Sequence, residues 1–212
     1  SIKKNITKKT KAIVVCHWGG QPANILEIKR IIKGIKIKII EDAAHAFGAK
    51  INNQLIGNHG DFICFSFQAI KHFTTGDGGL LICKNMRDAK KARLLRWFGL
   101  NRNYKGNKWR QDIKDSGYKF HLNNLVSTIG IEQMKTIRSK IKKHIFNGYL
   151  FDKKIQNSHL IKIKRLANST SSFWVYTLLV KNREHFRLYM YKNGIRVDEI
   201  SYRNDRYSVF KK

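Results

Sequence analysis

A carboxylate, a hydroxyl and an amine each stand at or just past the end of an apolar run in this sequence. Asp42 ends one such run and is followed by small residues, which would let a flat molecule approach the backbone. Ser66 and Lys71 follow a second run, just before a glycine-rich turn. Ligand chemistry in α/β proteins gathers at the carboxyl ends of strands. These groups suit pyridoxal phosphate, because a lysine can form a Schiff base, an acid can pair the pyridinium nitrogen, and donors can bind the phosphate.

Two continuous stretches contain these residues. The first is IEDAAHAFGA over residues 40–49, and the second is GDFICFSFQAIKHFTTGDGG over residues 60–79. Both resemble motifs of the DegT/DnrJ/EryC1/StrS family of sugar-nucleotide aminotransferases, which are fold-type I enzymes that use pyridoxal phosphate. Further stretches agree with the family in the same order along the chain, at residues 17–23, 93–96, 117–124 and 203–210. The resemblance therefore covers nearly the whole chain.

The resemblance implies a role for five side chains. Lys71 takes the position of the Schiff-base lysine. Asp42 takes the position of the carboxylate that pairs the ring nitrogen, and His45 stands where the family has a residue facing the phenolic oxygen. Ser66 corresponds to a hydroxyl that binds the phosphate, and Lys119 lies nearest to the asparagine that a partner subunit offers to the phosphate. A carboxylate at Asp42 keeps the ring nitrogen protonated, so negative charge on the amino carbon is stabilised.

The implied activity is transfer of an amino group to a keto-sugar nucleotide, in amino-deoxy sugar biosynthesis for a polysaccharide or glycan. Glutamate is the usual amino donor in the family, and the active sites form between the two subunits of a homodimer. Some family members are instead sugar dehydratases with a histidine at the lysine position. Lys71 favours transamination over this nearest alternative.

Short strands that alternate with helices must position these groups. Strands are expected where β-branched runs occur, and helices where apolar residues recur at helical spacing. The expected strands cover residues 12–16, 37–40, 62–67 and 80–83, and the expected helices cover a segment opening at Pro22 and residues 86–98, with Phe98 facing inward. This order predicts an α/β sheet with parallel parts. With the resemblance, it indicates part of a fold-type I large domain with a mixed, mostly parallel sheet and helices.

The second half of the chain is expected to leave this sheet. A basic loop over residues 101–115 precedes a long helix over residues 122–155, with a break near Asn147 and Gly148. A strand over 173–180, a helix over 183–192 and a strand over 194–197 would then begin a small α+β domain. We therefore assign residues 1–140 to the C-terminal part of the large cofactor-binding domain. Residues 141–212 form the connecting helix and the beginning of the small domain.

The chain is expected to be part of a longer protein. It begins without a methionine, just before a core strand, and ends when the small domain has only begun. In the family, an N-terminal segment supplies a Gly-Thr turn at the phosphate and an aromatic ring on the cofactor. We therefore expect these 212 residues alone to bind pyridoxal phosphate poorly.

The charge of the chain suggests a different class of function. Lys and Arg number 43 against 14 Asp and Glu, a formal net charge of +29, which is typical of nucleic-acid binding. However, the 30 Lys, 27 Ile and 17 Asn with one Pro indicate an A/T-rich genome, because their codons share that bias. Basic clusters occur at residues 8–11 and 140–144, but basic residues are also scattered along the whole chain, which favours a solvated surface. We therefore consider nucleic acid an unlikely partner, and keep a basic nucleic-acid-binding module and an inactive gene remnant as alternatives.

The cysteines bear on compartment and metal binding. Cys16, Cys64 and Cys83 are far apart and odd in number, which argues against a disulfide framework and for a reducing compartment. His17, His59 and Cys64 lack the spacing of a zinc site, so no metal is expected. No apolar run approaches the roughly 18 residues of a membrane span. The sequence therefore predicts a cytoplasmic location and no membrane partner.

Overall fold

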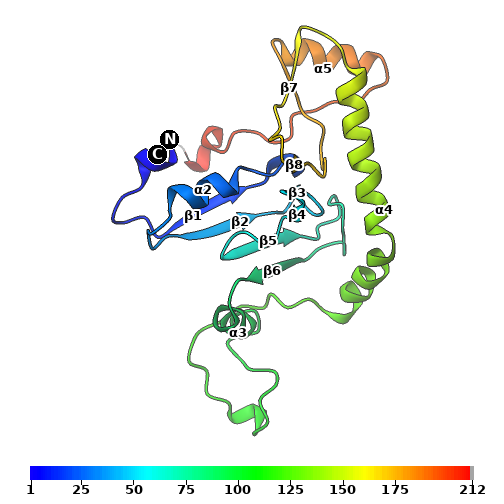
Figure 1. Ribbon diagram of the computed structural model, residues 1–212. Helices are drawn as coiled ribbons and strands as arrows, with labels where there is room; N and C mark the ends of the chain where they lie inside the picture. Colours follow the sequence, from blue (N-terminus) through cyan, green and yellow to red (C-terminus); the bar gives the residue numbers. More distant parts are fainter. Residues whose placement is uncertain (211–212) are drawn as a thin grey trace. The chain divides into compact units, whose positions relative to one another are not determined.

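The computed structural model describes residues 1–210 (Figure 1). The chain forms two compact units. The first unit contains Ser1–Lys154 and Lys164–Tyr176, and the second contains Ile155–Ile163 and the chain from Thr177 onward. The chain thus leaves the first unit, returns to it for one short segment, and leaves again. The division into domains over residues 1–140 and 141–212 stays a prediction.

A four-stranded sheet forms the centre of the first unit. Its strands are β1 (Ala12–Cys16), β2 (Lys38–Asp42), β5 (Phe62–Ser66) and β6 (Gly79–Cys83), in that spatial order. The first three strands are parallel, and β6 runs antiparallel to β5. The expected mixed, mostly parallel sheet is confirmed. Because β1, β2 and β5 are parallel, the loops that follow them meet at one edge of the sheet.

The helix α2 (Ile25–Ile31) follows β1 and precedes β2 along the chain, and it lies on one face of the sheet (Figure 1). Asn24 begins it, since the Asn24 side chain accepts a hydrogen bond from the backbone N–H of Glu27 at 3.2 Å. Ile25, Ile28 and other isoleucines pack into the core with the strand residues. Pro22 lies before this cap, so the expectation that it opens the helix is wrong.

A smaller sheet brings distant parts of the first unit together. The strands β3 (Lys50–Ile51) and β4 (Gln54–Leu55) form a hairpin, and β8 (Ser169–Thr170) pairs with β3. The turn residues Asn52 and Asn53 both have positive φ, which Asn tolerates better than most residues. Strands of two residues are too short to show alternation, so the sequence did not predict them. Their pairing places the residues after β8 beside the main sheet.

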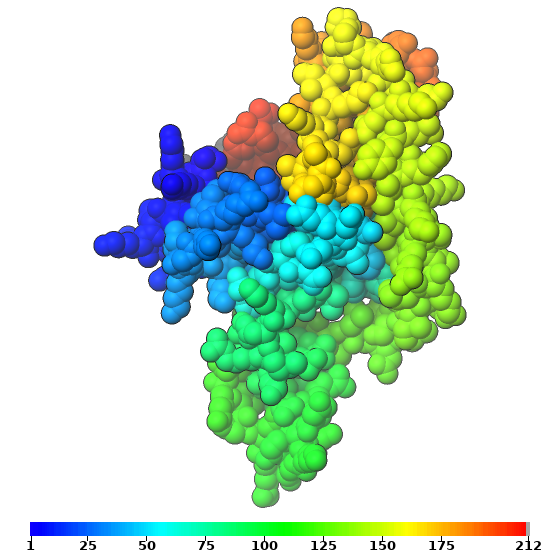
Figure 2. Space-filling view, in the orientation of Figure 1, coloured from blue at the N-terminus to red at the C-terminus, as the bar shows by residue number. Residues whose placement is uncertain are grey.

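The helix α3 (Met86–Leu95) is shorter than expected. Phe98 has φ of 54° and Gly99 has φ of 80°, so the backbone turns away soon after the helix ends. Phe98 is 42% exposed, and its expected inward orientation is therefore wrong. The expected loop over residues 101–115 is present apart from the 3₁₀ turn η2 (Lys108–Arg110), and it projects from the first unit in Figure 2.

The helix α4 (Asn124–Lys154) is continuous over 31 residues, so the expected break near Asn147 and Gly148 is wrong. Gly148 is buried against the ring of Phe173, where a Cβ atom would clash. Gly148 therefore allows a close approach of two segments and does not end the helix. On the other side of the contact, Phe173 adopts a positive φ of 48°.

The second unit contains the strands β7 (Leu160–Lys162) and β9 (Leu178–Val180), which are antiparallel, and the helix α5 (Arg183–Lys192). Of the strand expected over residues 173–180, only β9 forms, and residues 194–197 form no strand. The remaining short helices are α1 (Ile2–Asn5), η1 (Trp18–Gly20), η3 (Asn204–Arg206) and η4 (Ser208–Phe210). Within residues 1–210, none of the helices is both long and apolar enough to cross a membrane.

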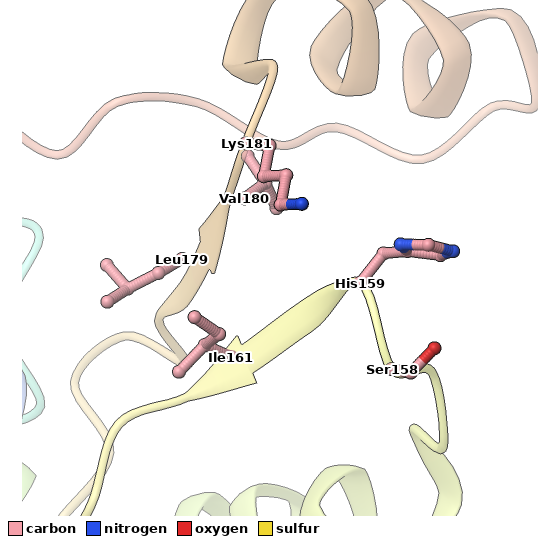
Figure 3. Close-up of a pocket in the computed structure, with 6 residues that line it drawn as sticks. All are labelled: Ser158, His159, Ile161, Leu179, Val180 and Lys181. Carbon is pink, nitrogen blue, oxygen red and sulfur yellow. The ribbon is translucent and has the colours of Figure 1, made fainter.

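A small pocket lies on the paired strands β7 and β9 (Figure 3). Six residues of the second unit line it: Ser158, His159, Ile161, Leu179, Val180 and Lys181. It contains none of the site residues that the sequence predicts.

Candidate active site

Asp42 lies at the carboxyl end of β2, between the ends of two parallel neighbours. Cys16 of β1 is its register partner on one side, and Cys64 of β5 is its partner on the other. The Asp42 Oδ1 atom accepts a hydrogen bond from the backbone N–H of Ala44 at 3.1 Å. This bond holds the carboxylate of a half-buried residue at the edge where the three loops meet.

Lys71 follows β5 and lies near Asp42. Burial lowers the pKa of the Lys71 amine, and the charge of Asp42 acts in the opposite direction. The Lys71 Nζ atom lies 4.2 Å from the centre of the Trp174 ring system. The fold thus brings the predicted Schiff-base lysine and the predicted ring-nitrogen carboxylate to one place, although 28 positions of sequence separate them.

His45 occupies the loop after β2 and contacts the loop after β1. Its Nδ1 atom accepts a hydrogen bond from the backbone N–H of Gly19 at 3.3 Å. Burial, followed by the charge of Lys71, lowers the pKa of His45. The ring is therefore neutral near pH 7, with its proton on Nε2. Its Nε2–H group is a hydrogen-bond donor, as a partner for an ionised phenolic oxygen must be.

Ser66 lies at the carboxyl end of β5 and begins the turn that carries Lys71. The Ser66 hydroxyl accepts a hydrogen bond from the backbone N–H of Gln68 at 3.3 Å. The backbone N–H of Lys71 in turn donates to the carbonyl of Gln68 at 3.0 Å. The hydroxyl and the amine therefore belong to one short turn.

Lys119 lies elsewhere in the first unit. It is exposed and forms an isolated antiparallel bridge with Trp97, just beyond α3. The neighbouring residues Tyr118 and Phe120 form backbone hydrogen bonds with Leu95 and Arg96. The contacts described for Lys119 are thus at the end of α3 and not in the loops that hold Asp42 and Lys71.

Trp174 is part of the site and was missed by sequence reasoning. Its indole ring stacks on the His45 imidazole, with ring centres 3.7 Å apart and planes at 15°. Its Nε1–H donates to the carbonyl of Ile70 at 2.9 Å. The sequence around Trp174 has the aromatic and β-branched composition of a strand. Trp174 was therefore interpreted as a strand residue and not as a site residue.

The buried pair of His17 and Glu41 was also missed. His17 follows β1, and Glu41 precedes Asp42 on β2. Their side chains are fully buried and 2.8 Å apart. Both residues lie in stretches that resemble the family, residues 17–23 and 40–49, and Glu41 is a charged residue in an apolar strand.

The residues at this edge fit pyridoxal phosphate. They comprise a carboxylate at a strand end, an amine with a lowered pKa, an imidazole with a free N–H and a hydroxyl. In the described part of the chain, no three His, Cys, Asp or Glu side chains are grouped to hold a metal ion. Such side chains could pair with an aromatic nitrogen, an aldehyde, a phenolic oxygen and a phosphate.

Known proteins share this sequence pattern. The model of the DegT/DnrJ/EryC1/StrS aminotransferase family matches residues 1–206. Protein MJ1066 of Methanocaldococcus jannaschii is 32% identical over 185 residues, which cover 84% of this chain and 48% of that protein. UDP-4-amino-4,6-dideoxy-N-acetyl-beta-L-altrosamine transaminase of Campylobacter jejuni is 31% identical over 162 residues, covering 75% and 42%. The chain thus spans about half the length of the curated relatives it matches.

Solved structures share the fold. AtS13 from Actinomadura melliaura matches with a TM-score of 0.94 and 32% identity, over 99% of this chain and 58% of that one. The GDP-4-keto-6-deoxymannose-3-dehydratase ColD matches with a TM-score of 0.83 and 26% identity, over 92% and 55%. These likenesses confirm the expected fold, a part of the fold-type I architecture.

Proposed function

The chain belongs to the DegT/DnrJ/EryC1/StrS aminotransferase family, and from this premise we propose that it serves a pyridoxal-phosphate-dependent transfer of an amino group to a keto-sugar nucleotide. The observation that carries the proposal is the juxtaposition of Lys71 with Asp42 at the carboxyl edge of the sheet. The transaminase and sugar aminotransferases among its relatives support the substrate class.

Four side chains would hold the cofactor. Lys71 would attach its aldehyde carbon, and Asp42 would hold a proton at its ring nitrogen. His45 would donate from Nε2 to the phenolic oxygen, and the Ser66 hydroxyl would donate to the phosphate. When bound, pyridoxal phosphate supplies an aromatic ring that accepts the electrons left on the amino carbon when its proton is removed.

Lys71 would also move the proton. Its lowered pKa increases the fraction of neutral amine, which can take a proton from the amino carbon of the donor. The same nitrogen, once protonated, can return that proton to the cofactor carbon. The negative charge of Asp42 favours the ammonium form, so the two environments keep the amine able to act in both directions.

The remaining parts of the proposal concern partners. We propose glutamate as amino donor, a homodimer, and a cytoplasmic location. The exposed Lys119, beside the end of α3, would reach the phosphate in the site of the partner subunit. The high positive charge would help to attract a sugar nucleotide, which is doubly phosphorylated.

A sugar dehydratase is the second candidate, because ColD shares the fold. The resemblance places a histidine at the lysine position in such dehydratases. Lys71 at this position favours the transaminase.

Cofactor trapping tests the proposal. A protein that carries these residues together with the N-terminal segment typical of the family is mixed with pyridoxal phosphate and reduced with borohydride. Peptide mass analysis should find the adduct on Lys71, and Lys71→Arg should abolish it. Lys90→Arg, at an exposed lysine of α3, is the matched control and should retain the adduct on Lys71. An adduct that is absent, or spread over many lysines, would contradict the proposal.

A further inference from the structure

The segment from Ser171 to Tyr176 lies among the loops that form the active site. The backbone N–H of Ser172 donates to the carbonyl of Gly20 at 3.0 Å, and that of Val175 donates to the carbonyl of Gly19 at 3.3 Å. The Ser172 hydroxyl donates to the carbonyl of His45 at 3.2 Å. The segment is thus attached to the loops after β1 and β2, about 130–155 residues earlier in the chain.

Trp174 is the residue of this segment that contacts the predicted catalytic groups. The Trp174 indole ring stacks on the His45 imidazole, with ring centres 3.7 Å apart. The centre of the same indole lies 4.2 Å from the Lys71 Nζ atom. The hydrogen bond from Nε1 to the carbonyl of Ile70 fixes the ring in its plane. An ammonium group at this distance from an indole face is attracted to the electrons of the ring.

Two histidines form hydrogen bonds with the backbone directly before Trp174. His72 Nε2 lies 3.0 Å from the carbonyl oxygen of Ser172, and His144 Nδ1 of α4 lies 3.1 Å from that of Phe173. Carbonyl oxygens only accept, so each imidazole must donate its N–H here. The two rings also contact each other edge to face, with centres 4.6 Å apart. Two consecutive carbonyls directly before Trp174 are therefore held from two different elements.

The proposed reaction requires the Lys71 amine to be held in place after its release. A lysine side chain has four rotatable bonds, and a free one samples many conformations. In the proposed reaction Lys71 must leave the cofactor carbon while the amino group of the substrate occupies it. The released amine must stay close to the reacting carbons to transfer a proton.

We propose that Trp174 is a positioning residue that holds the released Lys71 amine inside the active site, and that His72 and His144 set the position of its indole ring. This inference rests on the proposed function of Lys71. Trp174 acts through Lys71 and His45. Attraction to the ring favours the ammonium form, so Trp174 also helps to keep the proton that Lys71 has removed.

Nuclear magnetic resonance of labelled lysines tests the positioning. Reductive methylation with ¹³C-formaldehyde adds methyl groups to lysine nitrogens and preserves their charge, and Lys71→Arg identifies the Lys71 signal. In the protein without cofactor, that signal should be displaced upfield by the indole ring current. Trp174→Leu should abolish the displacement and raise the fraction of neutral amine at a given pH about two- to fivefold, because the attraction to the ring is lost.

Matched variants separate the indole ring from general disruption. Trp174→Phe keeps an aromatic face and should retain part of the displacement, and Trp109→Leu removes an indole that is 97% exposed and should change nothing at Lys71. His144→Leu removes the N–H donor and should reduce the displacement, whereas His144→Gln keeps a donor and should preserve more of it.

Two results would overturn the inference. One is a Lys71 signal without upfield displacement in the unsubstituted protein, a measurement that needs only the assignment variant Lys71→Arg to fold. The other is an equal titration of Lys71 in the Phe and Leu variants of Trp174. Because both measurements are made without cofactor, failure of borohydride trapping would reject the proposed function and leave the positioning of Lys71 intact.

Discussion

The imidazole Nε2 atom of His17 lies 2.8 Å from the carboxylate Oε2 atom of Glu41, and both side chains are fully buried. The His17 Nδ1 atom accepts from the backbone N–H of Ala23 at 3.0 Å, so the ring proton is on Nε2 and points to Glu41. The Glu41 Oε1 atom accepts from the backbone N–H of Gly60. This network ties together the loops around β1, β2 and β5, on the strand that ends in Asp42.

Glu41→Leu should destabilise the first unit by about 2–5 kcal/mol, because the N–H groups of His17 and Gly60 lose their buried acceptor. Urea unfolding monitored by circular dichroism measures the change. The matched control is Glu132→Leu on α4, where an exposed pair with Lys135 is lost and the expected change is below about 1 kcal/mol. Equal losses in the two variants would contradict a structural role for the buried pair.

Asp42→Asn should lower the pKa of Lys71 further, since the carboxylate charge acts against the lowering by burial. The titration midpoint of the ¹³C-methylated Lys71 signal should therefore move to lower pH, with the fraction of neutral amine rising at every pH below it. Asp77→Asn, in the exposed turn before β6, is the control. A midpoint that moves upward in Asp42→Asn would show that Lys71 does not sense this carboxylate.

Gly20→Ala should displace the segment that carries Trp174. A Cβ atom on Gly20 would lie 2.7 Å from the Ser172 Oγ atom and 2.8 Å from the Phe173 nitrogen. Gly34 has a similar positive φ, 80° against 91°, but a Cβ atom there meets nothing within 4 Å. Gly20→Ala should therefore lower the free energy of unfolding by about 1–3 kcal/mol more than Gly34→Ala.

The two glycine variants are compared by urea unfolding. The comparison cancels the cost of a positive φ, which both substitutions share, and leaves the cost of the collision. Equal losses would mean that residues 172–173 do not pack against Gly20 as described.

Acid should destabilise the protein through His72. Burial, with the neighbouring His144, lowers the pKa of His72 to about 4 from its ordinary 6.5. Between pH 6.5 and 4, His72 is protonated in the unfolded chain but remains neutral in the folded chain. The free energy of unfolding therefore decreases as the pH falls. This difference between the pKa values of His72 in the folded and unfolded chain corresponds to about 3 kcal/mol in the free energy of unfolding.

His72→Gln should flatten the loss of stability across this pH window, as measured by urea unfolding at several pH values. The exposed His159→Gln is the control for removing a histidine from the unfolded chain. An unchanged slope in His72→Gln would contradict a buried neutral His72.

Local patterns predicted the central sheet well. The four main strands and α5 lie where β-branched runs and helical spacing placed them, because burial on both faces of a sheet requires continuous apolar runs. The errors occurred where a distant contact decides the conformation. Gly148 lies within α4, where its missing side chain leaves room for the Phe173 ring, and the strand expected from residue 173 begins only at Leu178 because Phe173 turns with positive φ.

The sequence by itself determined the family and predicted Asp42, His45, Ser66 and Lys71 as cofactor-binding residues, since each lies in a motif a few residues from the end of a strand. Only the tertiary structure decided which neighbours these groups have. Trp174 reaches Lys71, and His144 reaches Phe173, through the pairing of β8 with β3 and the packing of α4. Such contacts join residues about 30–130 positions apart in the sequence. They depend on how distant segments pack together, so a local sequence pattern cannot predict them.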